Sequence, residues 1–128
     1  MIDPSFRTLR RRSGELNVAA DREQDEDTAA LLMFYAAECA LKAVYLDQHK
    51  LRDTSSANAY KRAARFFGHD LIGLIEELNI PANAVGKPPA TKLRSNNSPL
   101  AVKTLHEAWR YGEKAERVND FDTPGFVI

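Results

Sequence analysis

Apolar residues along most of the chain recur three and four positions apart, which is the spacing of one face of an α-helix. The clearest such segment spans residues 27–49, where apolar residues occupy most of the helix circumference. We therefore expect this helix at the centre of the fold, with Asp27 or Thr28 as its N-cap. The preceding segment, residues 1–26, is polar, and its pattern predicts only a short helix over residues 14–22.

Two more amphipathic helices are predicted on either side of Gly68. Residues 57–67 have helical spacing, and Gly68 follows as a residue that commonly ends a helix. Residues 71–78 repeat apolar positions at i, i+3, i+4 and i+7. His69 and Asp70 lie between these helices, where a polar side chain can accept the unpaired amides of the second helix.

The last third of the chain begins with a segment that favours loops. Residues 81–99 are rich in Pro, Asn, Ser and Gly, and such a long loop is often functional. Ser98 and Pro99 then suit the N-cap and first position of a last helix. Residues 120–128 are expected to form a non-helical tail.

These elements predict an all-α protein, because no segment alternates in the manner of a strand. The expected architecture is an up-and-down bundle of four to five helices, with a long loop before the last helix. Its expected organisation is a polar N-terminal segment over residues 1–26, the bundle over residues 27–119 and the tail over residues 120–128. A chain of 128 residues is long enough for one core.

Charge and cysteine content add restrictions on function. Lys+Arg and Asp+Glu both total 18, so the formal net charge is zero, which argues against nucleic-acid binding through bulk charge. The single cysteine, Cys39, suits a cytoplasmic location. The longest uninterrupted apolar run, residues 29–37, is too short to span a bilayer, so we expect no membrane contact. The three histidines lack metal-ligand spacing, and we expect neither a metal nor a cofactor.

Three sequence blocks together resemble the HEPN family (higher eukaryotes and prokaryotes nucleotide-binding), which consists of small all-α domains. These blocks are AAECALKAVYL at residues 36–46, GHDLIGLIEEL at residues 68–78 and AWRYGEK at residues 108–114. They match, in order, the family's A-E-x-x-L-K-A helix, its G-H-x-L or H-D-L helix start and its R-Y dipeptide on the last helix. The chain departs from the family at Gly112, where proline or serine usually follows R-Y.

The resemblance implies either of two activities within a prokaryotic defence or toxin–antitoxin-like system. Some HEPN domains are metal-independent endoribonucleases with an R-x4-6-H signature, and two copies meet across a dimer interface. Arg62 and His69 match that spacing as a candidate catalytic pair: an imidazole can take a proton from a 2′-hydroxyl, and a guanidinium can stabilise the charged phosphate. Ala63 replaces the usual polar residue, and Gly68 interrupts the helix between them. The other activity is non-catalytic binding of a protein partner, a nucleotide or RNA.

Candidate binding residues lie on the central helix and near the two later family blocks. Glu38 and Lys42 are spaced i, i+4 in the favourable order, and in so apolar a helix at least one of them needs a buried partner. Arg110 is the expected partner of Glu38. The face of the central helix that carries Tyr35, Glu38 and Lys42 either binds a ligand or bonds to another helix. The candidate binding residues are Tyr35, Glu38, Lys42, His69, Asp70, Arg110 and Tyr111.

Three hypotheses for function follow. The first is a non-catalytic HEPN-like module that forms a homodimer and binds a protein partner, a nucleotide or RNA. The second is a metal-independent endoribonuclease that uses Arg62 and His69, or a composite site with Arg110. The third is a helical adaptor that recognises its partner through the loop at residues 81–99 and the tail at residues 120–128.

Overall fold

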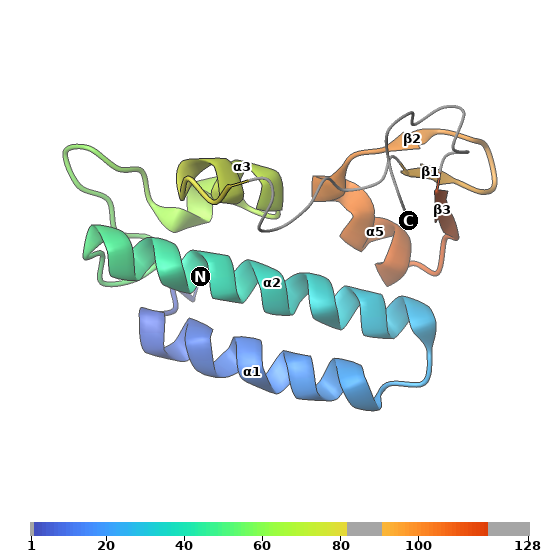
Figure 1. The fold of residues 1–128 in the computed structure, drawn as a ribbon, viewed down its shortest axis with the longest axis horizontal. Coiled ribbons are helices and arrows are strands. Elements are labelled where there is room, and N and C mark those ends of the chain that lie inside the picture. The colour runs from blue at the N-terminus through green and yellow to red at the C-terminus, as the bar shows by residue number, and fades with distance from the viewer. Residues whose placement is uncertain (1, 82–90, 118–128) are drawn as a thin grey trace.

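Two long antiparallel helices form one side of the molecule (Figure 1). In the computed structural model, which describes residues 2–81 and 91–117, α1 (Phe6–Arg22) packs along the length of α2 (Glu26–His49). The N-cap of α2 is Asp25, whose carboxylate accepts a hydrogen bond from the Thr28 amide, so the cap lies slightly earlier than predicted.

The first helix is much longer than predicted. It begins at Phe6 and not at residue 14, because Ser5 accepts a hydrogen bond from the Thr8 amide and caps the helix there. Its inward face is buried through Leu9, Leu16 and Ala20, while the arginines of its first half point to solvent. The polar N-terminal segment is therefore largely a helix of the packed structure.

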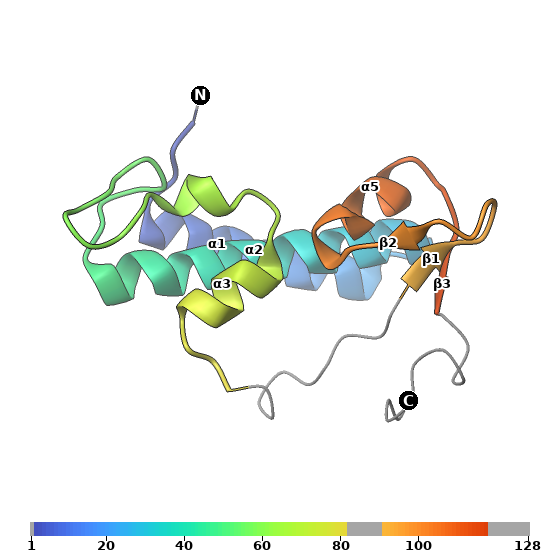
Figure 2. The ribbon, with the colours of Figure 1, turned by 90° about the horizontal axis from the view of Figure 1, so that it is seen from above.

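A second layer covers the other side of α2 (Figures 1 and 2). It contains the 3₁₀ helix η1 (Ala64–Phe67), α3 (Leu71–Glu77), the 3₁₀ helix η2 (Val102–Thr104) and α5 (Leu105–Arg110). Both α3 and α5 contact α2, as α1 does from the opposite side. The prediction that the helix at residues 27–49 is central is confirmed, and so is the short helix after Asp70.

The prediction of a purely helical fold is wrong, because a small antiparallel sheet lies beside α5 (Figure 1). β1 (Thr91–Leu93) pairs with β2 (Pro99–Leu100) on one edge and with β3 (Ala115–Arg117) on the other. Pro99 lies in the edge strand β2, where the missing amide proton is tolerated. The expected helix start at Ser98 and Pro99 is therefore wrong, and helical structure begins only at Val102.

The helix predicted over residues 57–67 is also wrong, apart from η1 at its end. Side chains there bond to nearby backbone amides and compete with the helix. Asp53 accepts from the Ser55 amide at 3.0 Å, and Asn58 accepts from the amides of Tyr60 and Lys61, both at 2.8 Å. These local turns hold the segment in an irregular loop between α2 and η1.

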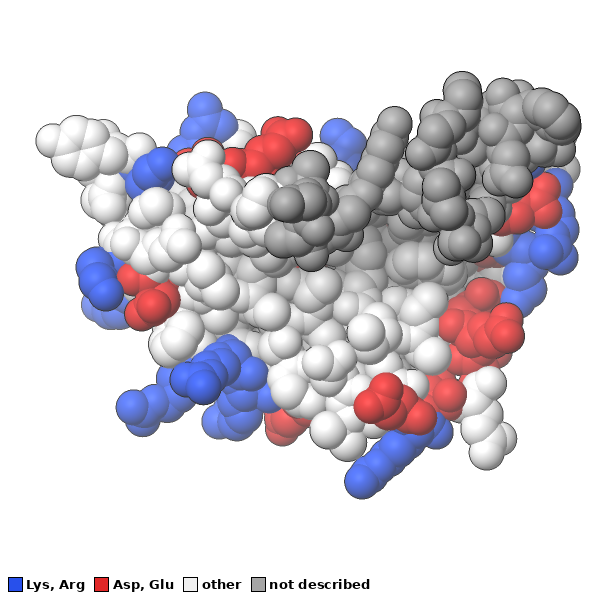
Figure 3. Space-filling view, in the orientation of Figure 1, with Lys and Arg blue, Asp and Glu red and all other residues white. Residues whose placement is uncertain are grey.

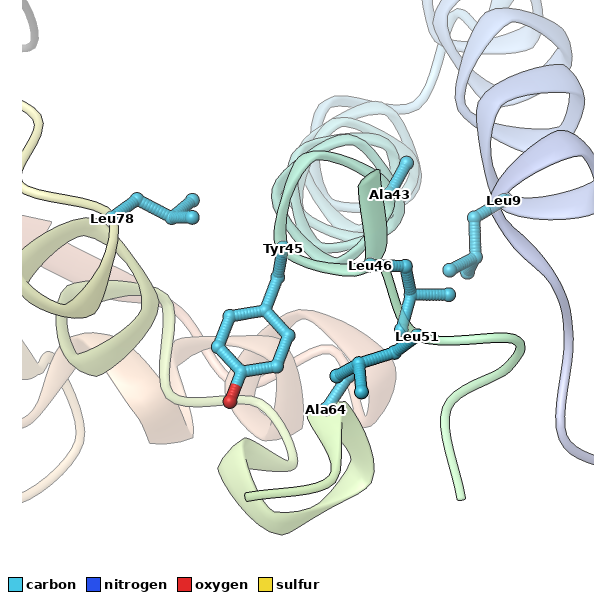
Figure 4. Packing of buried hydrophobic residues seen from close by; sticks show 7 residues of the cluster. All are labelled: Leu9, Ala43, Tyr45, Leu46, Leu51, Ala64 and Leu78. Carbon is cyan, nitrogen blue, oxygen red and sulfur yellow. The ribbon is translucent and has the colours of Figure 1, made fainter. Parts of the chain in front are cut away.

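A cluster of buried hydrophobic residues lies at the C-terminal end of α2 (Figure 4). Tyr45 is fully buried, and its hydroxyl donates to the Arg62 carbonyl at 2.6 Å, which fixes the irregular loop against the helix. The cluster consists of Leu9, Ala43, Tyr45, Leu46, Leu51, Ala64 and Leu78.

Two expectations are not decided by the fold. The uninterrupted apolar run of α2 is too short to span a bilayer, but the whole helix is long and apolar enough to do so. Core helices of soluble proteins pass the same test of length and composition. The absence of membrane contact and the cytoplasmic location stay predictions. The tail at residues 120–128 and residues 82–90 of the long loop lie outside the described part of the chain.

Candidate functional site

The candidate site lies where the start of α3 and the helix α5 meet above the middle of α2 (Figure 2). Three segments that are distant in sequence contribute to it. Tyr35, Glu38 and Lys42 come from α2, His69 precedes α3, and Arg110 ends α5. The structure therefore gathers most of the predicted binding residues in one region.

Glu38 is the centre of the polar contacts. Its Oε1 lies 2.6 Å from Nδ1 of His69, and its Oε2 accepts from Nζ of Lys42 at 3.3 Å. The side chains of Glu38 and Lys42 are 14% and 11% exposed, whereas that of His69 is 42% exposed. A carboxylate bonded to Nδ1 orients the ring and leaves Nε2 available to a ligand.

Arg110 does not have the partner that the sequence predicts. Its guanidinium donates to the Tyr35 hydroxyl, while Glu38 is occupied by Lys42 and His69. Arg110 is exposed, and hydrogen bonds to Tyr35 and Tyr111 raise its pKa above the ordinary value. The expectation of a Glu38–Arg110 pair is wrong, although both residues belong to the same region.

His106 is a member of the site that was not predicted. Its ring centroid lies 4.0 Å from that of His69, and the residue is only 4% exposed. Burial and the nearby charges of His69 and Arg110 lower the pKa of His106, although Glu107 and the Lys103 backbone oppose them. In the described part of the chain, no group forms a well-aligned hydrogen bond with its buried Nδ1. The sequence could have indicated His106 through its position four residues before Arg110, which places the two residues on the same helix face.

Arg62 lies outside this cluster. Its guanidinium packs over the Phe66 ring, 4.3 Å from the centroid, and its carbonyl accepts from Tyr45. No described hydrogen bond or ion pair joins Arg62 to His69, and the chain between them turns at Gly68, which has a φ of +53°. The structure thus does not bring the Arg-x6-His pair into contact.

The remaining predicted residues have simpler positions. Asp70 is the N-cap of α3, and its Oδ1 accepts from the Gly73 amide at 3.0 Å. Tyr111 is 73% exposed and lies beside Arg110, with 6.0 Å between the guanidinium carbon and the ring centroid. Asp70 is therefore a helix cap, and Tyr111 forms the outer edge of the site.

The site offers a cation and hydrogen-bond donors. Across residues 2–81 and 91–117, no three His, Cys, Asp or Glu side chains are arranged to hold a metal ion. The exposed guanidinium of Arg110 and the imidazole of His69, whose side chain is 42% exposed, are groups that bind phosphate oxygens. The chemistry available here is anion binding and metal-free proton transfer.

Comparison with known proteins gives no further assignment. No family model, no curated protein and no solved structure matches this chain.

Proposed function

We propose that the protein is a HEPN-like module that binds the phosphate of a nucleotide or of RNA where α2, α5 and the start of α3 meet. The observation behind this proposal is the convergence of Arg110, Tyr35 and His69 from three separate segments. An exposed guanidinium makes bidentate hydrogen bonds to phosphate, and a neighbouring phenol and imidazole add donors. The HEPN-like sequence blocks at residues 36–46, 68–78 and 108–114 support the same class of ligand.

Binding without catalysis is favoured by the arrangement of the two histidines. A pair of catalytic imidazoles needs space for the reacting phosphate between them. The rings of His69 and His106 are 4.0 Å apart, so they touch each other and leave no such space. Arg62, the other residue of the family-like motif, is packed on Phe66.

The binding proposal is tested by fluorescence anisotropy with a labelled single-stranded RNA and, separately, with a labelled nucleotide. We expect Arg110→Ala to weaken binding by about tenfold or more, because a charged hydrogen bond contributes roughly 1.5–3 kcal/mol. Arg22→Ala is the matched control, since Arg22 is an exposed arginine at the C-terminal end of α1, which packs on the other side of α2 from α5 (Figure 1). Equal losses for both variants, or no binding by the wild type, would contradict the proposal.

A second candidate, metal-independent RNA cleavage, is favoured by the contact between Glu38 and His69. With Nδ1 held at 2.6 Å by the carboxylate, Nε2 of His69 is free to take the 2′-hydroxyl proton. The 2′-oxygen would attack the adjacent phosphorus, the P–O5′ bond would break, and the departing 5′-oxygen would take a proton from water. The products would be a 2′,3′-cyclic phosphate and a 5′-hydroxyl. Arg110 would stabilise the charge on the phosphate.

Cleavage is tested with purified protein in EDTA, using wild type, His69→Ala, Glu38→Gln and Arg62→Ala. Activity that is lost in the first two variants and retained in Arg62→Ala would establish a ribonuclease with the composite site. Activity that requires Arg62 would instead support the Arg-x6-His pair. Absence of cleavage together with Arg110-dependent binding would leave the binding module as the function.

A further inference from the structure

A small pocket lies between the loop after α2 and the helix α3. Its volume is about 330 Å³, within the range of roughly 300–1,000 Å³ that is typical of ligand sites. None of the residues that line it belongs to the candidate site described above. Its walls combine aromatic rings with a guanidinium and a carboxylate, which are groups that suit a planar polar ligand. The lining residues are Tyr45, Tyr60, Arg62, Phe67 and Glu77.

The loop after α2 holds the ring of Tyr60 out in solvent. Tyr60 is 91% exposed, and within residues 2–81 and 91–117 no second ring packs on it. Its backbone is nevertheless fixed, because the Asn58 side chain accepts hydrogen bonds from the amides of Tyr60 and Lys61. An exposed ring on an ordered backbone offers a stacking surface at little cost in conformational entropy.

Arg62 adds a second planar group to the pocket. Its guanidinium carbon lies 4.3 Å from the centroid of the Phe66 ring, and its carbonyl accepts from the Tyr45 hydroxyl at 2.6 Å. Both the backbone and the side chain of Arg62 are thus held in place. Nucleobases stack on arginine guanidinium planes as well as on aromatic rings, so this side chain suits a planar ligand.

Glu77 places a carboxylate at the same pocket. Its Oε1 accepts from Nζ of Lys61 at 2.9 Å, and this hydrogen bond lowers the pKa of Glu77, so the carboxylate stays ionised near neutral pH. In the part of the chain that the structure describes, no side chain bonds to its second oxygen. An ionised carboxylate only accepts hydrogen bonds, so the ligand must supply N–H or O–H groups.

Among the four RNA bases, guanine has the edge that best suits a carboxylate. Its N1–H and its N2 amino group are adjacent donors, so together they can bond to both oxygens of Glu77. Adenine and cytosine each have an unprotonated ring nitrogen beside the amino group, and uracil has a carbonyl on each side of its one N–H. These acceptors would face the carboxylate and be repelled by it.

The position of the pocket suits a strand of RNA that also reaches the candidate site. Figure 3 shows basic side chains beside acidic ones at the upper left, where Figure 1 places the loop after α2 and the helix α3. Phe67 lines the pocket, and His69 of the candidate site follows two positions later. Two residues of chain span at most about 7 Å, so consecutive nucleotides can reach both places.

From these groups we infer that the pocket binds a guanine base, which stacks on Tyr60 and Arg62 and donates its N1–H and N2 amino hydrogens to Glu77. The inference rests on the proposed function, because the guanine belongs to the same RNA whose phosphate lies at Arg110. RNA that contains only uridine leaves the pocket empty. Binding and cleavage at the phosphate site can therefore be measured separately from the pocket.

The test measures fluorescence anisotropy with labelled uridine oligonucleotides that carry one central guanosine, inosine or adenosine. Inosine is the matched ligand control, because it keeps N1–H and lacks only the N2 amino group. We expect inosine to bind about tenfold more weakly than guanosine, since one hydrogen bond to a charged group is lost, and adenosine to bind no better than inosine. Calorimetry with guanosine 5′-monophosphate shows whether a free nucleotide occupies the same pocket.

Variants of the pocket assign the preference to single side chains. Glu77→Gln should reduce the preference for guanosine over inosine to about threefold or less, because a neutral amide is a weaker acceptor. Glu76→Gln is the matched control, since Glu76 is exposed on the same helix and does not line the pocket. Tyr60→Ala should weaken guanosine binding by about tenfold, whereas Tyr60→Phe keeps the ring and should bind as the wild type does. Circular dichroism checks that each variant keeps its helicity.

The inference is overturned by a wild type that binds the three oligonucleotides equally, or by Glu76→Gln and Glu77→Gln that lose the preference to the same extent. Its failure differs from failure of the proposed function. Weaker binding by Arg110→Ala without any guanosine preference keeps the phosphate site and rejects the pocket. A preference that depends on Glu77, with unchanged binding by Arg110→Ala, keeps the pocket and rejects the phosphate site. A wild type that binds neither the oligonucleotides nor guanosine 5′-monophosphate rejects both.

Discussion

At the scale of single residues, the buried imidazole of His106 makes stability depend on pH near neutrality. Burial lowers the pKa of His106 in the folded state, while the unfolded chain has the ordinary value near 6.5. The unfolded state therefore binds the proton first, and the free energy of unfolding falls as the pH drops below about 6.5. Urea denaturation at the two pH values measures this effect. Between pH 7.5 and pH 5.5, the free energy of unfolding should fall less in His106→Asn than in the wild type. An identical loss in both proteins would contradict this account.

The nearly buried pair of Glu38 and Lys42 gives a prediction for a double-mutant cycle. Glu38→Gln leaves the ammonium of Lys42, which is only 11% exposed, without its partner, and should cost about 2 kcal/mol. Glu38→Gln/Lys42→Met removes both charges and should be more stable than Glu38→Gln alone. Chemical denaturation of the four proteins measures the coupling, and additive effects would show that the pair contributes no coupling free energy.

Residue-scale predictions from the sequence succeed where the interaction is local. The Glu38–Lys42 pair follows from helical spacing alone, and the structure confirms it. The partner of Arg110 depends on which elements pack together, and there the prediction is wrong. His106 was missed for the same reason, because its burial arises from its packing against Phe34 and His69 and not from any local pattern.

At the scale of elements, a substitution at the start of α3 sets the loss of a helix cap against the helix propensity of alanine. A Cβ at Gly73 would lie 2.5 Å from Oδ2 of Asp70, the residue that caps the helix. Gly73→Ala should therefore leave the stability nearly unchanged or slightly lower, because the lost cap costs about 1 kcal/mol and offsets the roughly 0.5–1 kcal/mol that alanine gains in a helix. Gly14→Ala is the matched control and should stabilise by about 0.5–1 kcal/mol, because its Cβ has open space. Equal stabilisation by both changes would contradict the cap.

The loop after α2 contains a carboxylate, that of Asp53, whose protonation should lower the stability of the protein in acid. Hydrogen bonds from Ser55 and Ser56 lower the pKa of Asp53 to about 2. Because the folded pKa lies below the unfolded one, this stabilisation is complete above about pH 4 and is lost as the pH falls through about 2. Asp53→Ala should remove that part of the acid sensitivity, which circular dichroism between pH 5 and pH 2 can follow. An unchanged acid transition would contradict the role of the turn.

The same loop explains why one predicted helix failed. Residues 57–67 have helical spacing, but Asp53 and Asn58 use their side chains to bond nearby amides before a helix can start. The helix after Asp25 was predicted from its long apolar segment, although its expected cap was Asp27 or Thr28, and the helix after Asp70 was predicted from its apolar periodicity. Helical spacing therefore failed where nearby polar side chains bond the backbone amides instead.

At the scale of the whole molecule, the small sheet could not be predicted, because its strands pair across long distances in the sequence. The strands of the small sheet are two or three residues long, too short to show alternation. Their register, with Thr91 between Leu100 and Arg117, depends on the packing of α5 beside them. The mainly helical architecture and the central helix could be predicted, because amphipathic spacing is visible in the chain itself.

The central claim, that a phosphate ligand binds where α2, α5 and the start of α3 meet, can be tested with the three histidines as internal reporters. The measurement is an NMR titration of the histidine side-chain nitrogens with single-stranded RNA in EDTA. We expect the resonances of His69 and His106 to shift, while His49, which packs against Tyr45 at the far end of α2, stays unchanged. Shifts confined to His49, or none at concentrations where RNA is bound, would place the ligand elsewhere and contradict the proposed site.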